Sequence, residues 1–222
     1  MQRYNKNYII NNNKSDSYIF RKQDITSYNN RQTNLSEIRE RYFASIKILA
    51  SKFIRTAKRD KIIITGFYYI PGNISIGINE NQINNLGLIL TKLYNRPVEL
   101  HLNKLTYPYL DRHILSQYVR LLTQKYNFKR IKKRLFRNIP LTNHEIRYNN
   151  DKMISYITGI KIEISGRLIT ERARPRQTIS TAKMGSFIKR NKKTSLDYRL
   201  HTFKNSNGAL TVKIWLNQEI VA

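Results

Sequence analysis

The residues of this chain that could do chemistry are its cationic side chains, which gather in two stretches. The first lies between Asp111 and Glu145, where no acidic residue interrupts the lysines and arginines. Its candidate RNA-binding residues are Lys125, Lys129, Arg130, Lys132, Lys133, Arg134 and Arg137. In a helix over 128–137, like charges stand four positions apart on one face and repel unless an anion lies against them, while Ile131 and Leu135 face the core. A solvated basic face is the alternative, but the uncompensated repulsion favours a ridge that binds phosphates.

The second cationic stretch runs from Arg167 to Lys193 and contains a single acidic residue, Glu171. Its candidate RNA-binding residues are Arg167, Arg172, Arg174, Arg176, Lys183, Lys189, Arg190, Lys192 and Lys193. Pro175 and Gly185 argue against a regular helix, so we expect a loop with room for one more strand. Guanidinium groups on such a loop suit irregular, crowded phosphates. Phe187 either anchors the core or stacks on a base.

Catalytic and metal-binding patterns are missing from the sequence. The 14 acidic residues are scattered, without the clustered spacing that a Mg²⁺-dependent nuclease needs. The four histidines stand apart, and no serine elbow accompanies them. The chain has no cysteine, which excludes zinc ribbons, iron–sulfur sites, thiol nucleophiles and disulfides. We therefore predict a protein that is not an enzyme and that uses no metal, no cofactor and no small-molecule substrate.

The whole chain shares the cationic bias. Of its 222 residues, 41 are lysine or arginine and 14 are aspartate or glutamate, which gives a formal net charge of +27. A body this positive repels itself and needs a polyanion, which nucleic acid supplies through counterion release. An anionic membrane surface is the alternative partner, but it favours amphipathic helices. The longest nearly apolar run, residues 62–70, is too short to span a bilayer.

Composition also bears on the origin of the gene. The sequence holds 31 Ile, 24 Asn and 15 Tyr against 8 Gly and 5 Pro. The first group has codons rich in A and T, and the second has codons rich in G and C. This bias predicts an A/T-rich genome, a property that organelle genomes share with some nuclear and bacterial ones. The first 14 residues lack the pattern of a secretion signal or a mitochondrial presequence, so a protein working in an organelle is expected to be made there or to have been processed.

Periodicity in the first half predicts the order α, β, β, α, β. Residues 1–33 lack a sustained period, and we expect an extended basic arm there. A helix should begin at Asn34 and run to about Lys58, because apolar residues recur three and four positions apart. The elements expected next are strands over 61–70 and 74–78, a helix over 82–95 and a strand over 97–104.

The second half is expected to combine two helices with three or four strands. Apolar spacing predicts helices over 108–126 and 128–137, followed by a loop over 141–152. Alternation predicts strands over 156–165, 194–203 and 209–216. Asn207-Gly208, between the last two strands, is the signature of a type I′ hairpin.

Three segments resemble the small-subunit ribosomal protein three family. They are TGIKIEISGRL at 158–168, NFKRIKKRLF at 127–136 and the closing SLDYRLHTF…NGALTVKIWL, and the likeness extends from about Arg96 to Leu216. The A/T-biased composition is similar to that of the family's mitochondrially encoded, Var-type fungal branch. The resemblance implies an α+β fold with a type II KH-like domain over 34–105. A C-terminal domain over 106–222, with two helices on a four-stranded sheet, would follow it.

One part of the KH pattern is missing. A KH domain clamps backbone nucleotides with a GxxG loop, whereas residues 77–81 here read GINEN. We therefore expect this domain, with its degenerate loop, to serve as a scaffold.

The resemblance also implies a function. The implied function is that of a structural constituent of the mitochondrial small ribosomal subunit. The protein would lie in the subunit head, near the site where messenger RNA enters, and would be encoded in the organelle. The implied partners are small-subunit rRNA, messenger RNA and neighbouring ribosomal proteins of the head. Lys129, Arg130 and Lys133 match the family positions that line the channel through which messenger RNA enters. Two alternatives stay open: an intron-encoded maturase or nuclease, and a basic membrane-surface protein.

Overall fold

The computed structural model describes residues 35–58, 60–72, 79–137, 139, 155–170, 178–187 and 194–220. Helices and two separate sheets make up these residues, which confirms the predicted α+β class. The chain divides between Thr106 and Tyr107 into two compact units. The predicted arm over 1–33, the strand over 74–78 and the loop over 141–152 lie outside the described residues.

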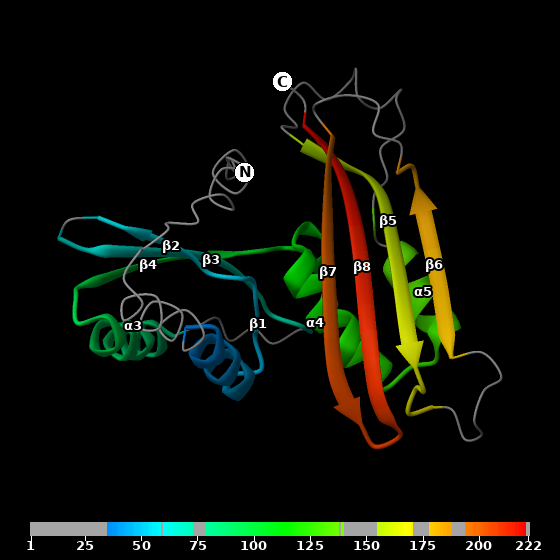
Figure 1. Cartoon of the computed structure of the whole chain (residues 1–222), viewed down its shortest axis with the longest axis horizontal. Coiled ribbons are helices and arrows are strands. Elements are labelled where there is room, and N and C mark those ends of the chain that lie inside the picture. The colour runs from blue at the N-terminus through cyan, green and yellow to red at the C-terminus, as the bar shows by residue number, and fades with distance from the viewer. Residues whose placement is uncertain are drawn as a thin grey trace, which may run out of the picture. The chain divides into compact units, whose positions relative to one another are not determined.

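In the N-terminal unit, β3 is the central strand (Figure 1). Strands β1 and β2 pair antiparallel with its two ends, and β4 pairs with it in parallel. The parallel pair is joined through α3, as a parallel connection requires. After a helix over 35–45, the elements are β1 (Leu49–Ala50), β2 (Ile54–Ala57), β3 (Ile62–Tyr69), α3 (Glu80–Tyr94) and β4 (Val98–Lys104).

The prediction that the first helix runs to about Lys58 is wrong, because the helix ends at residue 45. Lys47 adopts a left-handed conformation, with φ of 60°. The N–H of Lys47 donates to the carbonyl of Ala44 (3.1 Å), and the N–H of Ile48 donates to that of Phe43 (3.0 Å). These two bonds form a Schellman motif, which stops a helix and satisfies its last carbonyls. The next residues enter the sheet as β1.

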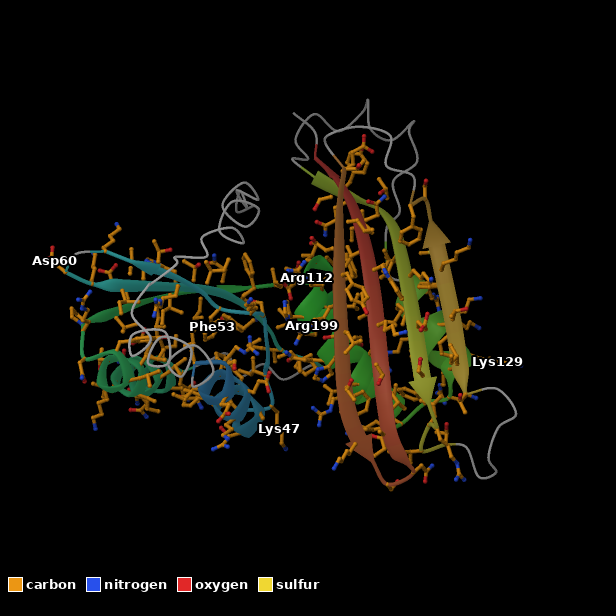
Figure 2. The ribbon with its side chains drawn as sticks, in the orientation of Figure 1. Lys47, Phe53, Asp60, Arg112, Lys129 and Arg199 are labelled. Carbon is orange, nitrogen blue, oxygen red and sulfur yellow. The ribbon has the colours of Figure 1, made fainter. Side chains whose placement is uncertain are left out.

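The core of the N-terminal unit lies between its helices and the sheet. Ile64 of β3 and Leu86 and Leu90 of α3 are almost completely buried in it. The rings of Phe43 and Phe53 meet edge to face with centroids 5.7 Å apart, so the first helix is anchored to the chain that leads into β2. Phe53 also covers Gly66 of β3, where a Cβ would overlap the Phe53 ring. Figure 2 labels Phe53 inside this unit.

In the C-terminal unit, α4 and α5 lie against one face of an antiparallel sheet with the order β6-β5-β8-β7 (Figure 1). The predicted strands correspond to β5, β7 and β8, and β6 is the additional strand for which the second cationic stretch had room. The elements are η1 (Pro108–Leu110), α4 (Arg112–Thr123), α5 (Phe128–Arg137), β5 (Ser155–Gly166), β6 (Ile179–Gly185), β7 (Thr194–Asn205) and β8 (Gly208–Ile220).

Two local details of this unit differ from the predictions. The helix expected from residue 108 is divided, because the Asp111 carboxylate accepts hydrogen bonds from the backbone N–H groups of His113 (2.8 Å) and Ile114 (2.9 Å) and so begins α4 there. The β7–β8 hairpin closes between Asn205 and Gly208. A type I′ turn needs positive φ at both central residues, which here are 206 and 207. Among the described residues, positive φ at a non-glycine occurs only at Lys47 and Asn95, so this turn is not type I′. Gly208, just after the turn, has a positive φ of 120°.

Alternate side chains of β5 and β8 form the core of the C-terminal unit. Ile160, Ile162 and Ile164 of β5 are at most 2% exposed, and alternate residues of β8 lie beside them. Leu115 and Val119 of α4 and Ile131 and Leu135 of α5 pack against this face. The two helices therefore cover one face of the sheet, and the side of each helix that is turned away from the sheet is exposed.

Candidate nucleic-acid interface

Helix α5 separates apolar from cationic side chains. Ile131 and Leu135 are 1% and 5% exposed, as the helical spacing predicted. The side-chain carbonyl of Asn127 accepts from the N–H of Arg130 (3.1 Å), which caps the first turn. The cations of the helix are all exposed, namely Lys129, Arg130, Lys132, Lys133, Arg134 and Arg137. Because α5 contains no carboxylate, its outer surface is a continuous cationic ridge, and we call these six residues the α5 ridge.

Tyr126, just before α5, organises two arginines of the ridge. The guanidinium carbon of Arg130 lies 4.7 Å from the centre of the Tyr126 ring, and that of Arg134 lies 5.6 Å from it. Arg134 also donates a hydrogen bond to the Tyr126 hydroxyl (3.2 Å). Cation–π contacts restrict a long side chain without neutralising its charge. Tyr126 therefore holds both guanidinium groups in place for an anion.

Other cations are engaged within the fold. Arg112, at the start of α4, pairs with Asp197 of β7 (3.4 Å), and Figure 2 labels it where α4 meets β7. The guanidinium carbon of Arg120 lies 5.1 Å from the centre of the Phe203 ring. In the N-terminal unit, Lys61 donates to Glu99 (2.6 Å), which holds the pKa of Glu99 below its ordinary value.

The α5 ridge differs from these paired cations. Among the described residues, no carboxylate lies within ion-pair distance of any of its six side chains. Lys129 and Lys133 stand one turn apart, as do Arg130 and Arg134, so like charges are neighbours along the helix. Lys125 is exposed just before the ridge, where its N–H donates to the carbonyl of Leu122 (3.1 Å). The ridge is therefore a concentrated positive surface that an external polyanion would neutralise.

The second cationic stretch is only partly described. Lys183 is exposed on β6, Arg167 is half-buried just after β5, and Phe187 is half-buried just after β6. The remaining predicted residues of this stretch lie outside the described residues, namely Arg172, Arg174, Arg176, Lys189, Arg190, Lys192 and Lys193.

Lys161 is a cation of the sheet that the two stretches do not include. It lies opposite Lys183 on β6 and opposite Trp215 on β8. Its ammonium group lies 4.4 Å from the centre of the Trp215 ring. The alternation in IKIEIS at 160–165 carries the signal for this position, because it turns Lys161 away from the buried isoleucines.

The described residues contain no group of three or more side chains suited to hold a metal ion. His101 is exposed on β4, His113 is buried in α4 and His201 is half-buried on β7, so the three lie on different elements. His144 falls outside the described residues. In the same part of the chain, no helix is long and apolar enough to cross a membrane.

These features define a class: a strongly basic α+β protein whose exposed, carboxylate-free helix is suited to polyanions. The chain belongs to the family described as mitochondrial ribosomal protein (VAR1), whose model matches residues 48–219. The resemblance to the ribosomal protein three family is confirmed. The chain is 34% identical over 176 residues to the small ribosomal subunit protein uS3m of Mycosarcoma maydis, an alignment that covers 71% of this chain and 64% of that protein.

A bacterial relative shows the wider family. The chain is 23% identical over 172 residues to the small ribosomal subunit protein uS3 of Buchnera aphidicola subsp. Schizaphis graminum. That alignment covers 77% of this chain and 66% of the relative. In both comparisons, the matched region spans slightly less than two thirds of the relative's length.

Proposed function

We propose that this chain is a structural constituent of the mitochondrial small ribosomal subunit and that it binds rRNA through the α5 ridge. The observation that carries the proposal is the set of six exposed cations on α5, which have no described carboxylate partner. Membership in a family of mitochondrial ribosomal proteins supports it. So do the names of the two relatives, both small ribosomal subunit proteins.

The mechanism is electrostatic neutralisation. Each lysine or arginine that docks on a phosphate releases condensed counterions, so a dense ridge gains affinity without reading bases. The arginines held by Tyr126 offer planar donors to phosphate oxygens, and the lysines add point charges. The candidate residues of the second cationic stretch are proposed to add further phosphate contacts.

Part of the ridge faces messenger RNA in this proposal. Lys129, Arg130 and Lys133 match the family positions at the channel through which messenger RNA enters, and all three are exposed. The subunit head, with its rRNA and neighbouring ribosomal proteins, is the proposed location. Residues 34–105 are proposed to form a degenerate KH-like scaffold, and the gene is proposed to lie in the mitochondrial genome.

The protein acts as a structural component and not as an enzyme in this proposal. An intron-encoded maturase or nuclease needs carboxylates that hold Mg²⁺, and no such group occurs among the described residues. Neither the family nor the relatives support that alternative.

Cosedimentation tests the proposal. The full chain, carrying an affinity tag, should migrate with the mitochondrial small subunit through a gradient at raised salt. Recovery with the large subunit, or only in the free fraction, would contradict it. Flotation with anionic liposomes in the absence of RNA would instead favour the membrane-surface alternative.

A further inference from the structure

The outer face of the C-terminal sheet carries an apolar patch. Helices α4 and α5 cover the opposite face, behind the sheet in Figure 1. Three successive outward positions of β7 hold Leu196, Tyr198 and Leu200, which are 57%, 45% and 44% exposed. Residues two apart on a strand share a face, so these side chains form a continuous apolar row. We call this row, with Trp215 beside it, the β7 patch.

Trp215 extends the patch onto β8. It lies opposite Tyr198 in the strand register, and the two ring centres are 5.2 Å apart with the planes tilted by 44°. On its other side, Trp215 lies opposite Lys161 of β5, and Lys161 in turn lies opposite Lys183 of β6. One row across the four strands therefore passes from two ammonium groups to two aromatic rings.

The composition of the patch favours a protein over RNA as its occupant. The Lys161 ammonium group already lies over the Trp215 ring, so a base would have to displace it in order to stack on that face. Leu196 and Leu200 are aliphatic and have no π face. Apolar side chains around an aromatic centre, bordered by polar groups, are instead typical of protein–protein interfaces.

Charge further defines the partner. Along the border of the patch lie Lys161 and Lys183, and the nearby Glu163 is already paired with Lys213 (2.7 Å). A complementary surface therefore presents aspartate or glutamate opposite the two lysines.

The size of the exposed row points in the same direction. Three large apolar side chains stand at successive outward positions of β7, and the Trp215 ring lies beside the middle one. A contiguous apolar patch of this kind indicates a surface that another molecule covers in the assembled state.

We propose that the β7 patch docks a neighbouring protein through an apolar surface bordered by carboxylates. The inference rests on the proposed ribosomal function, because it places that neighbour in the same small subunit. It adds a protein-binding face on the outer side of the sheet, formed by residues other than those of the α5 ridge.

Site-specific crosslinking tests the proposal in assembled subunits. The photoreactive residue benzoylphenylalanine replaces Leu196, Leu200 or Lys133 in the full chain. We expect protein adducts from the two β7 positions and rRNA or messenger RNA adducts from position 133. RNA adducts from Leu196 and Leu200, or no adducts there, would overturn the docking proposal while position 133 still reports on the proposed function. Failure of the unsubstituted chain to enter the subunit would overturn both.

A second measurement uses charge instead of a probe. The double variant Leu196→Lys, Leu200→Lys replaces two apolar side chains of the patch with ammonium groups, one of them opposite Lys213 of β8. We expect its retention in subunits after a high-salt wash to fall by about tenfold, as at an interface hot spot. Its affinity for purified rRNA, which added cations do not weaken, should be unchanged or higher. Thr202→Lys, an exposed control on the same face of β7, should be retained like the unsubstituted chain. Equal retention of the double variant would overturn the proposal.

Discussion

The guanidinium carbon of Arg130 lies 4.7 Å from the centre of the Tyr126 ring. This contact orders a cation that is otherwise exposed on the α5 ridge. The Tyr126 hydroxyl accepts a hydrogen bond from a second arginine, Arg134 (3.2 Å), so one aromatic side chain fixes two charges of the proposed RNA-binding surface.

Replacing Tyr126 should weaken RNA binding without removing any charge. Tyr126→Leu loses both cation–π contacts, which are worth about 0.5–1 kcal/mol each at exposed sites. We expect the affinity for an rRNA fragment to fall by about two- to tenfold. Tyr126→Phe keeps the ring and should lose less. Tyr107→Leu, which changes an exposed tyrosine outside the ridge, is the control. Equal affinity of Tyr126→Leu and the unsubstituted chain would contradict this role.

Neutralising part of the ridge should change the salt dependence of binding. In the triple variant Lys132→Gln, Arg134→Gln, Arg137→Gln, three phosphate contacts are removed from ridge residues that the proposal does not assign to messenger RNA. The slope of log affinity against log salt concentration should fall in magnitude by about 2–3, because each contact contributes about 0.7–0.9. Titration of an rRNA fragment at several salt concentrations measures this slope. An unchanged slope would place the phosphate contacts elsewhere on the chain.

Reversing the three charges proposed to face messenger RNA should affect translation selectively. Lys129→Glu, Arg130→Glu, Lys133→Glu should slow the translation of structured messages and leave subunit assembly largely intact, because repulsion acts where messenger RNA is proposed to enter. The control reverses three exposed lysines of the N-terminal unit, Lys47, Lys52 and Lys92. Equal elongation on structured and unstructured templates in the first variant would count against contact with messenger RNA.

The cap of α4 should contribute measurably to stability. Asp111 accepts from the N–H groups of His113 and Ile114. Asp111→Ala should lower the free energy of unfolding by about 1–2 kcal/mol, whereas Asp111→Asn keeps a good cap and should lose much less. Chemical denaturation of the two variants measures the difference. Equal losses would show that the cap geometry is not what stabilises the helix.

Asp111 also predicts a pH dependence. Burial raises the pKa of its carboxyl above the ordinary value, more than the two backbone hydrogen bonds lower it. The folded chain therefore binds this proton more readily than the unfolded chain. The resulting stability is fully present below the ordinary pKa of aspartate and is lost as the pH rises through the raised folded pKa. We expect Asp111→Asn to lack this loss of stability when the free energy of unfolding of both proteins is measured across the same pH range. Identical pH profiles for the two proteins would contradict the role given to Asp111.

Two glycines of the N-terminal unit should respond in opposite directions to alanine. At Gly66 a Cβ would overlap the Phe53 ring, so Gly66→Ala should destabilise by about 1–3 kcal/mol through overpacking. At Gly87, in the middle of α3, the nearest atom is a Leu100 methyl at 3.8 Å. Gly87→Ala should stabilise by about 0.5–1 kcal/mol, because alanine favours the helix. Thermal unfolding of the two variants checks the sign, and a shift in the same direction for both would be inconsistent with the packing described.

The first helix shows why some element boundaries could not be predicted. Leu49 and Phe53 lie four residues apart, which suits one face of a helix but also places both on the same side of an extended chain. Both are buried, as the pattern required, yet they follow the Schellman motif at Lys47 and lie outside the helix. Burial of an apolar residue does not by itself distinguish the two conformations. The pairing of β1 and β2 with β3 decided between them.

The sequence alone determined the strong positive charge of this protein, the α5 ridge and its two buried anchors, because charge and helical period are local properties. Only the tertiary structure decided which cations stay available. Asp197 lies 85 residues from Arg112, and Trp215 lies on a different strand from Lys161, so no window of sequence reveals either contact. The β7 patch is also a feature that only the tertiary structure decided. Whether an alternating strand is covered on both faces depends on where α4 and α5 pack, and they pack on only one.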